Sequence, residues 1–492
     1  MASLWVYAGI LLAVQLARVY RVRFAKLRYI QQRYGGRYAL TPEEHKATGK
    51  PRMIDSYRGV RDAQRIVRLA ASWDTPFIFT KALEVALFRT YGIPTISSLL
   101  MHTGQLSRAE NASRRYVDTS GLIQAFMTYP VPRCGLAGDD VPPPPSDWET
   151  NREDPNDPRS SIALARVNFL HGRWGKKISN DDLLYTLSVF FIEPPKWIDA
   201  YEWRKTSELE KEAIFSLYYH IGRCMGITNI PDSRADFIEW SVRYEEDQMV
   251  YTKTNQEVAQ HTVNLLLYSL PRFAHGFARN LIASIMDERL RAAMGFPAAP
   301  SWVVHFKNIF FASRAVFVRY MMMPRSKPLS AMALGCDGDS DSEFNIEKLL
   351  SDGIPSVCPA SGARASDGRT CPVGGHTAAA EKPKTSPWRM ELKWYENDPV
   401  YARPYKKGSL AWMFEELRVQ TGLLKREDRR GAQKWRASTL PSDPKEPVQG
   451  LGGFRLEELG PTGLETKGRK EVFENAEKLH GRPLEGIWAF EP

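Results

Sequence analysis

The sequence predicts an all-α protein in which a helical body follows an N-terminal membrane anchor. Between about residues 54 and 325, apolar residues recur at spacings of three and four, which is the period of an α-helix. No series of alternating polar and apolar residues predicts a sheet. An apolar run at residues 2–17, interrupted only by Ser3 and Gln15, predicts the anchor.

The apolar run is at the short limit for a transmembrane helix. It reaches roughly 24 Å at ~1.5 Å per residue, which is closer to adequate in the thin bilayer of the endoplasmic reticulum. A basic run follows it at Arg18, Arg21, Arg23, Lys26, Arg28, Arg33 and Arg37. Because positive charge stays on the cytoplasmic side, we expect a single-pass anchor with a cytosolic body. An amphipathic helix on the membrane surface, or a first helix docked on the protein, is the alternative.

Charge and cysteine content narrow the function classes. Much of the net charge of +10 lies in the N-terminal basic run, which favours anionic lipid over nucleic acid as the partner. The five cysteines have irregular spacings and form no Cys-x-x-Cys pair, which fits a reducing compartment without a disulfide framework. No phosphate-binding loop, dinucleotide fingerprint, His-Glu-x-x-His or nucleophile elbow is present. The sequence therefore contains none of these common motifs of hydrolases and nucleotide-binding proteins.

The pattern of apolar residues predicts that the body is a succession of helices. Residues 75–89 begin with Thr-Pro, a capping residue followed by proline at the first helical position. A Tyr-Gly-Ile-Pro break at 91–94 ends this helix and starts another. Further helices are predicted at 160–174, 180–193, 207–225, 235–250, 255–292 and 300–323.

Composition divides the chain into four regions. We expect a membrane anchor with its basic segment at 1–35, a helical domain at 36–326, a disordered linker at 327–388 and a C-terminal extension at 389–492. The linker has too few large apolar residues to offset the entropy of ordering. Within the helical domain, residues 127–159 are rich in Pro and Asp and are expected to form a surface loop.

The segment RVNFLHGRW, residues 166–174, places two arginines and a histidine in a helix whose other residues predict burial. His171 falls among apolar residues on one face of this helix, and Arg166 lies in the adjoining stripe. A buried guanidinium keeps its charge and needs an anionic or strongly accepting partner. Asp182 or Asp118 would be a structural partner, whereas a haem propionate or an oxygen-derived ligand would be a functional one.

A second histidine, His275, lies on another predicted helix with apolar neighbours. Two such helices could enclose a haem, which needs a dry slot, an imidazole ligand and cations for its propionates. Arg173 and Arg89 are candidate cations for this purpose. The alternative is that these are unrelated core histidines, and His220 is a weaker third candidate.

Seven strings in order carry a resemblance to a known family. They are ALFRTYGIPTISSLL (86–100), RRYVDTSGLI (114–123), RVNFLH (166–171), DLLYTL (182–187), EWRKTSELE (202–210), LLLYSLP (265–271) and DERLRAAM (287–294). Together they resemble the fungal ER-bound oxygenase mpaB family, which shares a catalytic-domain superfamily with the rubber oxygenases. The similarity covers about 75–325 and resumes at 394–417 and 456–467.

This resemblance implies an oxygenase at the ER membrane with a globin-like helical core and a b-type haem. It further implies that O2 is used to cleave a carbon-carbon double bond in the isoprenoid chain of a lipophilic terpenoid or meroterpenoid. Arg166 matches the family arginine near the oxygen-binding side of the haem, and His171 and His275 match histidines of mpaB-type sequences. We therefore expect Arg166 and His171 to be catalytic, His171 and His275 to be the iron ligands, and Arg173 and Arg89 to contact the cofactor.

The chain departs from the rubber oxygenases at one position. By resemblance, their axial histidine comes from the helix after the arginine-containing one, and the matching segment here, 181–194, contains no histidine. Leu187 or Ser188 occupies the nearest position. Either His171 or His275 supplies the ligand, or this branch has lost haem. In the second case the chain would be a non-catalytic, membrane-tethered lipid-binding or scaffold protein with the same core.

Overall fold

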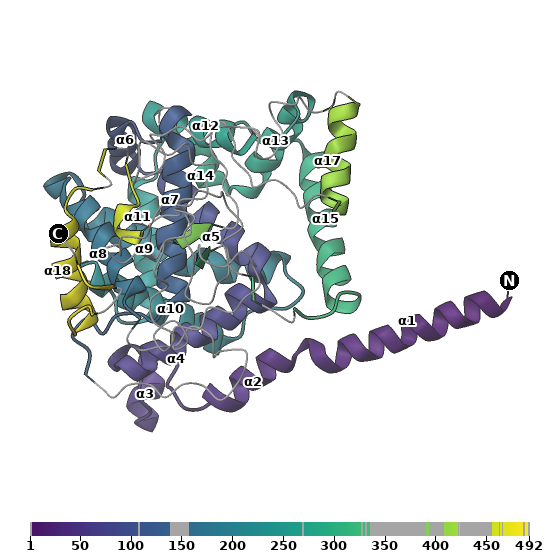
Figure 1. The fold of residues 1–492 in the computed structure, drawn as a ribbon, viewed down its shortest axis with the longest axis horizontal. Coiled ribbons are helices and arrows are strands. Elements are labelled where there is room, and N and C mark those ends of the chain that lie inside the picture. Colours follow the sequence, from purple (N-terminus) through teal and green to yellow (C-terminus); the bar gives the residue numbers. More distant parts are fainter. Residues whose placement is uncertain are drawn as a thin grey trace, which may run out of the picture.

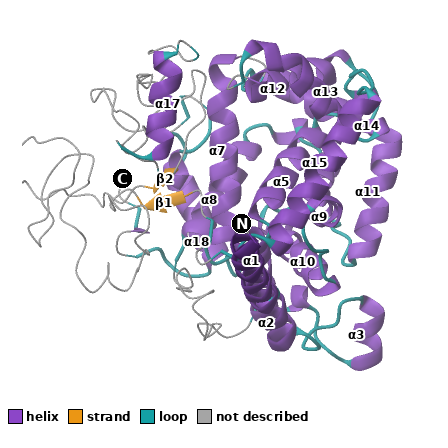
Figure 2. Cartoon of the chain, turned by 90° about the vertical axis from the view of Figure 1, so that its right-hand side faces the viewer, coloured by secondary structure: helices purple, strands orange, loops and turns teal. Residues whose placement is uncertain are grey.

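The computed structural model is helical in the part of the chain that it describes (Figures 1 and 2). This part comprises residues 2–106, 109–137, 157–267, 270–325 and 466–485, with short pieces at 328–329, 332–334, 390–392, 408–421, 423, 455–461, 463–464 and 488–490. One antiparallel pair of three-residue strands, β1 (Met332–Leu334) and β2 (Met390–Leu392), accompanies the helices. The all-α prediction is confirmed. Most of the predicted disordered linker, 327–388, and most of the Pro-rich loop lie outside the described residues.

Most helices from α1 to α15 follow one another with short connections, apart from the long segment between α7 and α8. In chain order they are α1 (Ala2–Arg23), α2 (Ala25–Tyr34), α3 (Pro42–Thr48), α4 (Tyr57–Arg68), α5 (Pro76–Thr90), α6 (Pro94–Thr103), α7 (Ala109–Thr128), α8 (Arg159–Gly172), α9 (Asn180–Tyr201), α10 (Glu208–Cys224), α11 (Arg234–Gln248), α12 (Lys253–Leu267), α13 (His275–Ile285), α14 (Glu288–Ala293), α15 (Ser301–Tyr320), α17 (Leu410–Gln420) and α18 (Arg469–His480). The predicted starts of α5, α8, α9, α10, α11 and α15 agree with these bounds to within one residue.

The predicted helix at 255–292 is wrong, because the structure divides it into α12, α13 and α14. Pro271 has no N–H to continue a helix, and a short 3₁₀ turn at Arg272–Ala274 follows it. The Asp287 side chain then accepts the N–H of Leu290 at 3.0 Å, which caps the start of α14. Apolar periodicity persists through all three helices, which is why spacing alone suggested one.

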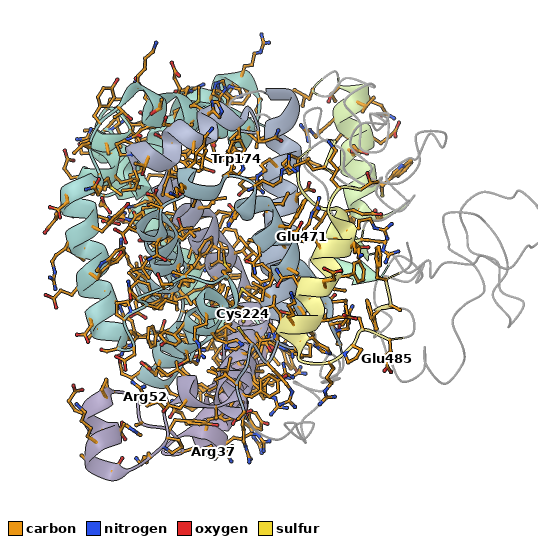
Figure 3. The ribbon with its side chains drawn as sticks, turned by 90° about the vertical axis from the view of Figure 1, so that its left-hand side faces the viewer. Arg37, Arg52, Trp174, Cys224, Glu471 and Glu485 are labelled. Carbon is orange, nitrogen blue, oxygen red and sulfur yellow. The ribbon has the colours of Figure 1, made fainter. Side chains whose placement is uncertain are left out.

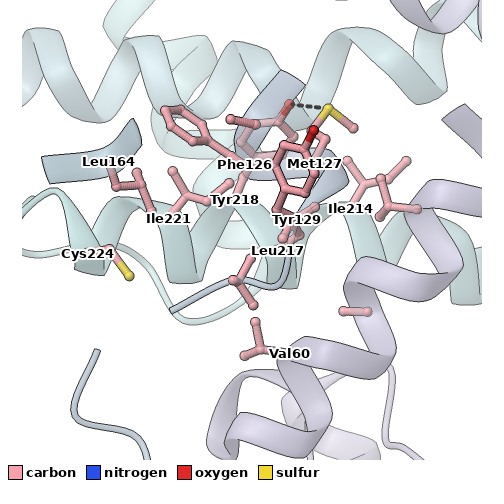
Figure 4. Packing of buried hydrophobic residues seen from close by; sticks show 14 of the residues in the cluster. Val60, Phe126, Met127, Tyr129, Leu164, Ile214, Leu217, Tyr218, Ile221 and Cys224 are labelled. Carbon is pink, nitrogen blue, oxygen red and sulfur yellow. Dashed lines mark hydrogen bonds between the residues drawn. The ribbon is translucent and has the colours of Figure 1, made fainter. Parts of the chain in front are cut away.

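Two clusters of buried apolar residues form the interior. The larger one joins α4, α8, α9 and α10, and Figure 4 shows part of it, with Tyr218 donating a hydrogen bond to the Met127 sulfur at 3.7 Å. The smaller cluster joins α5, α9, α12 and α14. Phe190 of α9 packs against both clusters. Helix α9 is therefore the shared wall between the two halves of the interior.

The C-terminal segment packs in the same core as the helical domain. Helix α18 and the 3₁₀ turn Leu456–Glu458 lie on α8, and Leu456, Val472, Phe473 and Ala476 are buried in the larger cluster. Figure 1 shows α18 beside α8, and in Figure 3 the same helix carries the labelled Glu471. Residues 455–485 thus complete the body that we assigned to residues 36–326.

Helix α1 extends away from the body (Figure 1). Within the described residues, no helix combines the length and the apolar composition needed to cross a bilayer, so the transmembrane anchor predicted at residues 2–17 is not supported. The apolar run forms one continuous helix with the first part of the basic run, up to Arg23. Its described apolar side chains, including Tyr7, Ile10 and Leu11, are exposed.

Replacing Phe473 with alanine should destabilise the whole body, because the ring is buried in the shared core. We expect a loss of about 3–5 kcal/mol in the free energy of unfolding, in one cooperative transition. The matched control is Phe414→Ala on α17, where the ring is 64% exposed and the loss should be small. Chemical denaturation of both variants provides the measurement. A separate, early transition for the C-terminal segment would contradict the shared core.

Candidate functional site

Helix α8 carries the segment RVNFLHGRW and is anchored at its first turn. The Asp157 carboxylate accepts the Arg159 backbone N–H at 3.0 Å and the Arg159 side chain at 2.5 to 3.0 Å. Both side chains are buried, and the Arg159 guanidinium lies 3.5 Å from the centre of the Tyr129 ring. A buried charge pair at the helix start fixes the position of α8 in the body.

The fully buried guanidinium of Arg166 binds the C-terminal segment. Its Nε donates to the Leu459 carbonyl at 2.8 Å, Nη2 donates to Leu464 at 2.8 Å and Nη1 donates to Lys467 at 3.0 Å. The predicted need for a strong acceptor is thus met by three backbone carbonyls. Asp182 and Asp118, the structural partners considered from sequence, are engaged elsewhere: Asp182 with Thr95 and Tyr244, and Asp118 with the Gly460 amide.

Two glycines let the C-terminal segment approach α8 closely. Gly460 has φ +130°, and a Cβ there would lie 2.9 Å from Leu170. Gly468 has φ +71°, and a Cβ there would lie 2.1 Å from the Phe169 ring. Larger residues would be strained and would push the segment off the helix. The Gly460 amide also donates to Asp118 of α7 at 3.0 Å, so the segment connects α7 with α8.

His171 lies near the end of α8 and faces α7. Its side chain is partly exposed, and neither ring nitrogen makes a hydrogen bond with a described residue. Loss of solvent contact, together with the positive charge of Arg115 on α7, lowers the pKa of His171 to about 4. The imidazole is therefore neutral at physiological pH, which is the form that binds a metal.

Arg115 is a cation without a matching carboxylate. Its Nη1 donates to Thr119 at 2.5 Å, and within the described residues no carboxylate lies within ion-pair distance of the guanidinium. Burial lowers its pKa from the ordinary value, and Asp118 partly opposes this. The hydroxyls of Tyr91 and Thr262 lie close to one another nearby, and neither makes a well-formed hydrogen bond in the described structure.

The other predicted cofactor-binding arginines have different surroundings. Arg89 is buried and donates to both oxygens of Glu245, at 2.6 and 2.5 Å, and to Asp287. Burial alone would lower the pKa of Arg89, but Glu245 raises it above the ordinary value. Arg173 is exposed, with its guanidinium 5.9 Å from the Phe169 ring. Among the described residues, neither arginine contacts His171.

The remaining histidine candidates lie apart from His171. His275 is the first residue of α13, and its Nε2 bonds the Leu270 carbonyl at 3.0 Å near the surface, so the expected dry surroundings are absent. The Pro271 turn is the reason, because it starts a new helix there. His220 is buried, and its Nε2 bonds the Pro132 carbonyl at 2.7 Å.

By resemblance, the rubber oxygenases carry their axial histidine near the position of Ser188. In this chain Ser188 is buried and hydrogen-bonds Tyr185 and Ser241.

His171 and Arg115 form the candidate site. A neutral imidazole without a hydrogen-bond partner can ligate iron, and a half-buried cation without a nearby carboxylate can pair with an anionic group such as a haem propionate. Within the described residues, no group of three or more His, Cys, Asp or Glu side chains is placed to hold a metal ion. The sequence did not lead us to predict a role for Arg115, although this residue lies in the string RRYVDTSGLI. A helical projection treats one helix at a time and cannot relate Arg115 on one helix to His171 on another.

Replacing Arg166 with methionine should release the C-terminal segment, because three carbonyls lose their donor at once. We expect a loss of about 3 kcal/mol or more in the free energy of unfolding, and faster proteolysis between residues 455 and 467. The control is Arg173→Met on the same helix, where the exposed guanidinium should contribute less than about 0.5 kcal/mol. Equal effects of the two substitutions would contradict the structural role of Arg166.

The depressed pKa of His171 makes stability depend on pH. An unfolded histidine binds a proton below about pH 6.5, whereas folded His171 does so only below about pH 4. Its contribution is therefore complete above about pH 6.5 and is lost as the pH falls toward 4. Urea unfolding of His171→Phe should show a drop between about pH 7 and pH 4.5 that is smaller by about 2–3 kcal/mol. The exposed-site control His305→Gln should keep the full drop, and an unchanged drop in His171→Phe would contradict the burial of His171.

Comparisons with known proteins identify the family to which the chain belongs. Residues 163–317, from α8 to α15, match the family model described as "ER-bound oxygenase mpaB/B'/Rubber oxygenase, catalytic domain". The chain is 33% identical over 309 residues to ER-bound oxygenase mpaB' of Penicillium brevicompactum, covering 60% of this chain and 67% of the relative. It is also 33% identical over 300 residues to ER-bound oxygenase mpaB of Penicillium roqueforti, strain FM164, covering 58% of this chain and 88% of the relative. The chain therefore belongs to the mpaB and rubber oxygenase family and is an oxygenase.

Proposed function

We propose that this oxygenase is haem-dependent, with His171 as the protein ligand of the iron. The observation that carries the proposal is the electrostatic pair formed by His171 and Arg115: the imidazole makes no hydrogen bond with a described residue, and the half-buried guanidinium that lowers its pKa has no carboxylate at ion-pair distance among the described residues. Most polar groups that are removed from solvent have a partner, so an imidazole without a hydrogen bond and a guanidinium whose charge is not balanced by a nearby carboxylate suggest that a ligand completes them. Haem b supplies both missing partners, an iron and a carboxylate.

Each side chain has a distinct task in this proposal. When bound, haem supplies the dioxygen chemistry that amino-acid side chains lack. His171 offers a nitrogen lone pair throughout the physiological pH range, because its pKa of about 4 keeps it neutral. Arg115 offers a fixed positive charge, either to a propionate or to negative charge that develops on oxygen. Burial of both groups strengthens these electrostatic interactions.

Arg166, His275, Arg173 and Arg89 are not part of the proposed site. Arg166 donates hydrogen bonds to three carbonyls, and Arg89 binds carboxylates. His275 and Arg173 lie at or near the surface. A buried guanidinium already bound to three acceptors has little capacity left for a ligand. We therefore assign the cofactor contacts to α7 and α8 alone.

For the substrate, we propose the isoprenoid chain of a lipophilic terpenoid or meroterpenoid, cleaved with O2 at a carbon-carbon double bond. The family name includes rubber oxygenases, and rubber is a polymer of isoprene units. The similar Penicillium proteins are named ER-bound. We propose the same membrane for this chain, with its body in the cytosol, and the exposed apolar side chains of α1 support membrane association.

The test is haem binding by the full chain and its variants, followed by absorption spectroscopy. The wild-type chain should show a Soret band and consume O2 with a farnesyl-bearing substrate. His171→Ala should lose the band, and Arg115→Met should weaken haem affinity by roughly 10-fold or more. The controls His275→Ala and Arg173→Met should bind haem like wild type. A wild-type chain without a Soret band, or loss of the band in His275→Ala alone, would overturn the proposal.

A further inference from the structure

The outer face of α15 is apolar and largely exposed in the described structure. Trp302, Phe306, Ile309, Val316 and Tyr320 recur at helical spacing along one stripe of this helix. All five are exposed, with Ile309 at 66%, Trp302 at 60% and Val316 at 58%. Helix α15 has 20 residues and is therefore about 30 Å long. A contiguous apolar patch of this length marks a binding surface, since scattered single residues would be the norm.

The α15 face is continuous with helix α1. The Arg23 guanidinium at the end of α1 donates to the carbonyls of Val318 and Met322, at the end of α15. The Gln15 side chain donates to the Met321 carbonyl at 3.1 Å. In Figure 1, α15 borders the side of the body toward which α1 extends, and Figure 2 shows that side face-on. The exposed apolar residues of both helices therefore belong to one surface.

The charged residues of α1 and α15 have one sign. Helix α15 contains no Asp or Glu, and the first acidic residue of the chain is Glu43. Arg18, Arg21 and Arg319 are exposed beside the apolar residues. An anionic lipid headgroup complements such a cationic border, whereas a protein surface of mixed charge would not. Trp302 and Tyr320, near the two ends of the helix, are residue types enriched at the boundary between lipid and water.

We propose that the exposed face of α15, together with α1, lays the body of the enzyme on the surface of an anionic phospholipid bilayer. In this arrangement α15 lies in the plane of the membrane, with its apolar stripe among the outer parts of the acyl chains. The surface extends to α13, because the Phe277 ring stacks on Trp302 with centroids 5.7 Å apart. This contact surface is separate from the candidate haem site and does not require α1 to span the bilayer.

The experiment is photo-cross-linking of the full chain to lipid. The protein is incubated with phosphatidylcholine vesicles that contain phosphatidylserine and a phospholipid carrying a diazirine on its acyl chain. Adducts are then mapped by mass spectrometry. The proposal predicts adducts in peptides of both α1 and α15, and fewer of them on vesicles of phosphatidylcholine alone. Adducts confined to α1, or protein-to-protein cross-links that join two copies through α15, would overturn it.

A pair of variants separates lipid contact from a folding defect. Ile309→Glu with Val316→Glu should reduce lipid adducts on α15 by roughly tenfold or more, because two apolar side chains no longer enter the bilayer. The control places glutamate at Val242 and Tyr251, which are exposed to 45% and 55% away from this face, and adducts on α15 should be unchanged. Circular dichroism confirms that both variants are folded. Unchanged adducts in the α15 variant would also overturn the proposal.

Discussion

A buried guanidinium keeps its charge, and Arg166 therefore has to be surrounded by acceptors. The structure meets this requirement with three carbonyls from a segment that lies almost 300 residues further along the chain. The same segment donates an amide to Asp118 of α7. In this way one buried charge ties α7 to α8, and these are the helices that carry Arg115 and His171. The C-terminal region, which composition marks as an extension, is part of what positions the candidate site.

Arg115 is half-buried and differs from several of the fully buried arginines in the described part of the chain. Arg89, Arg159 and Arg204 each bind at least one carboxylate at hydrogen-bond distance. Arg115 has only the Thr119 hydroxyl among the described residues, although burial opposes its charge. A buried cation without compensation costs free energy, so a fold retains it where an anion from outside completes it. The neighbouring neutral imidazole of His171 makes a metal-bearing, anionic cofactor the simplest such partner.

Helical periodicity predicted most of the elements, because the amphipathic pattern is local. It failed at 255–292, where the apolar period continues across the Pro271 turn and only the missing N–H of proline ends the helix. The resemblance and the helical projection together identified α8 and His171. Neither could show that Arg166 binds the C-terminal segment or that the charge of Arg115 acts on His171, since both interactions join parts of the chain that are distant in sequence. The structure places His275 near the surface and not in the dry surroundings that we expected. Periodicity could not show this, because it does not indicate which helix ends reach the surface.

The central claim is that the imidazole of His171 is the ligand that holds the cofactor iron. The most direct test replaces His171 with glycine, which leaves a space of the size of the ring, and then adds free imidazole. The account predicts that the glycine variant loses the Soret spectrum of the histidine-ligated protein and that imidazole restores it, because the small molecule occupies the vacated position. A glycine variant with the unaltered wild-type spectrum, insensitive to imidazole, would contradict the account and place the ligand elsewhere in the chain.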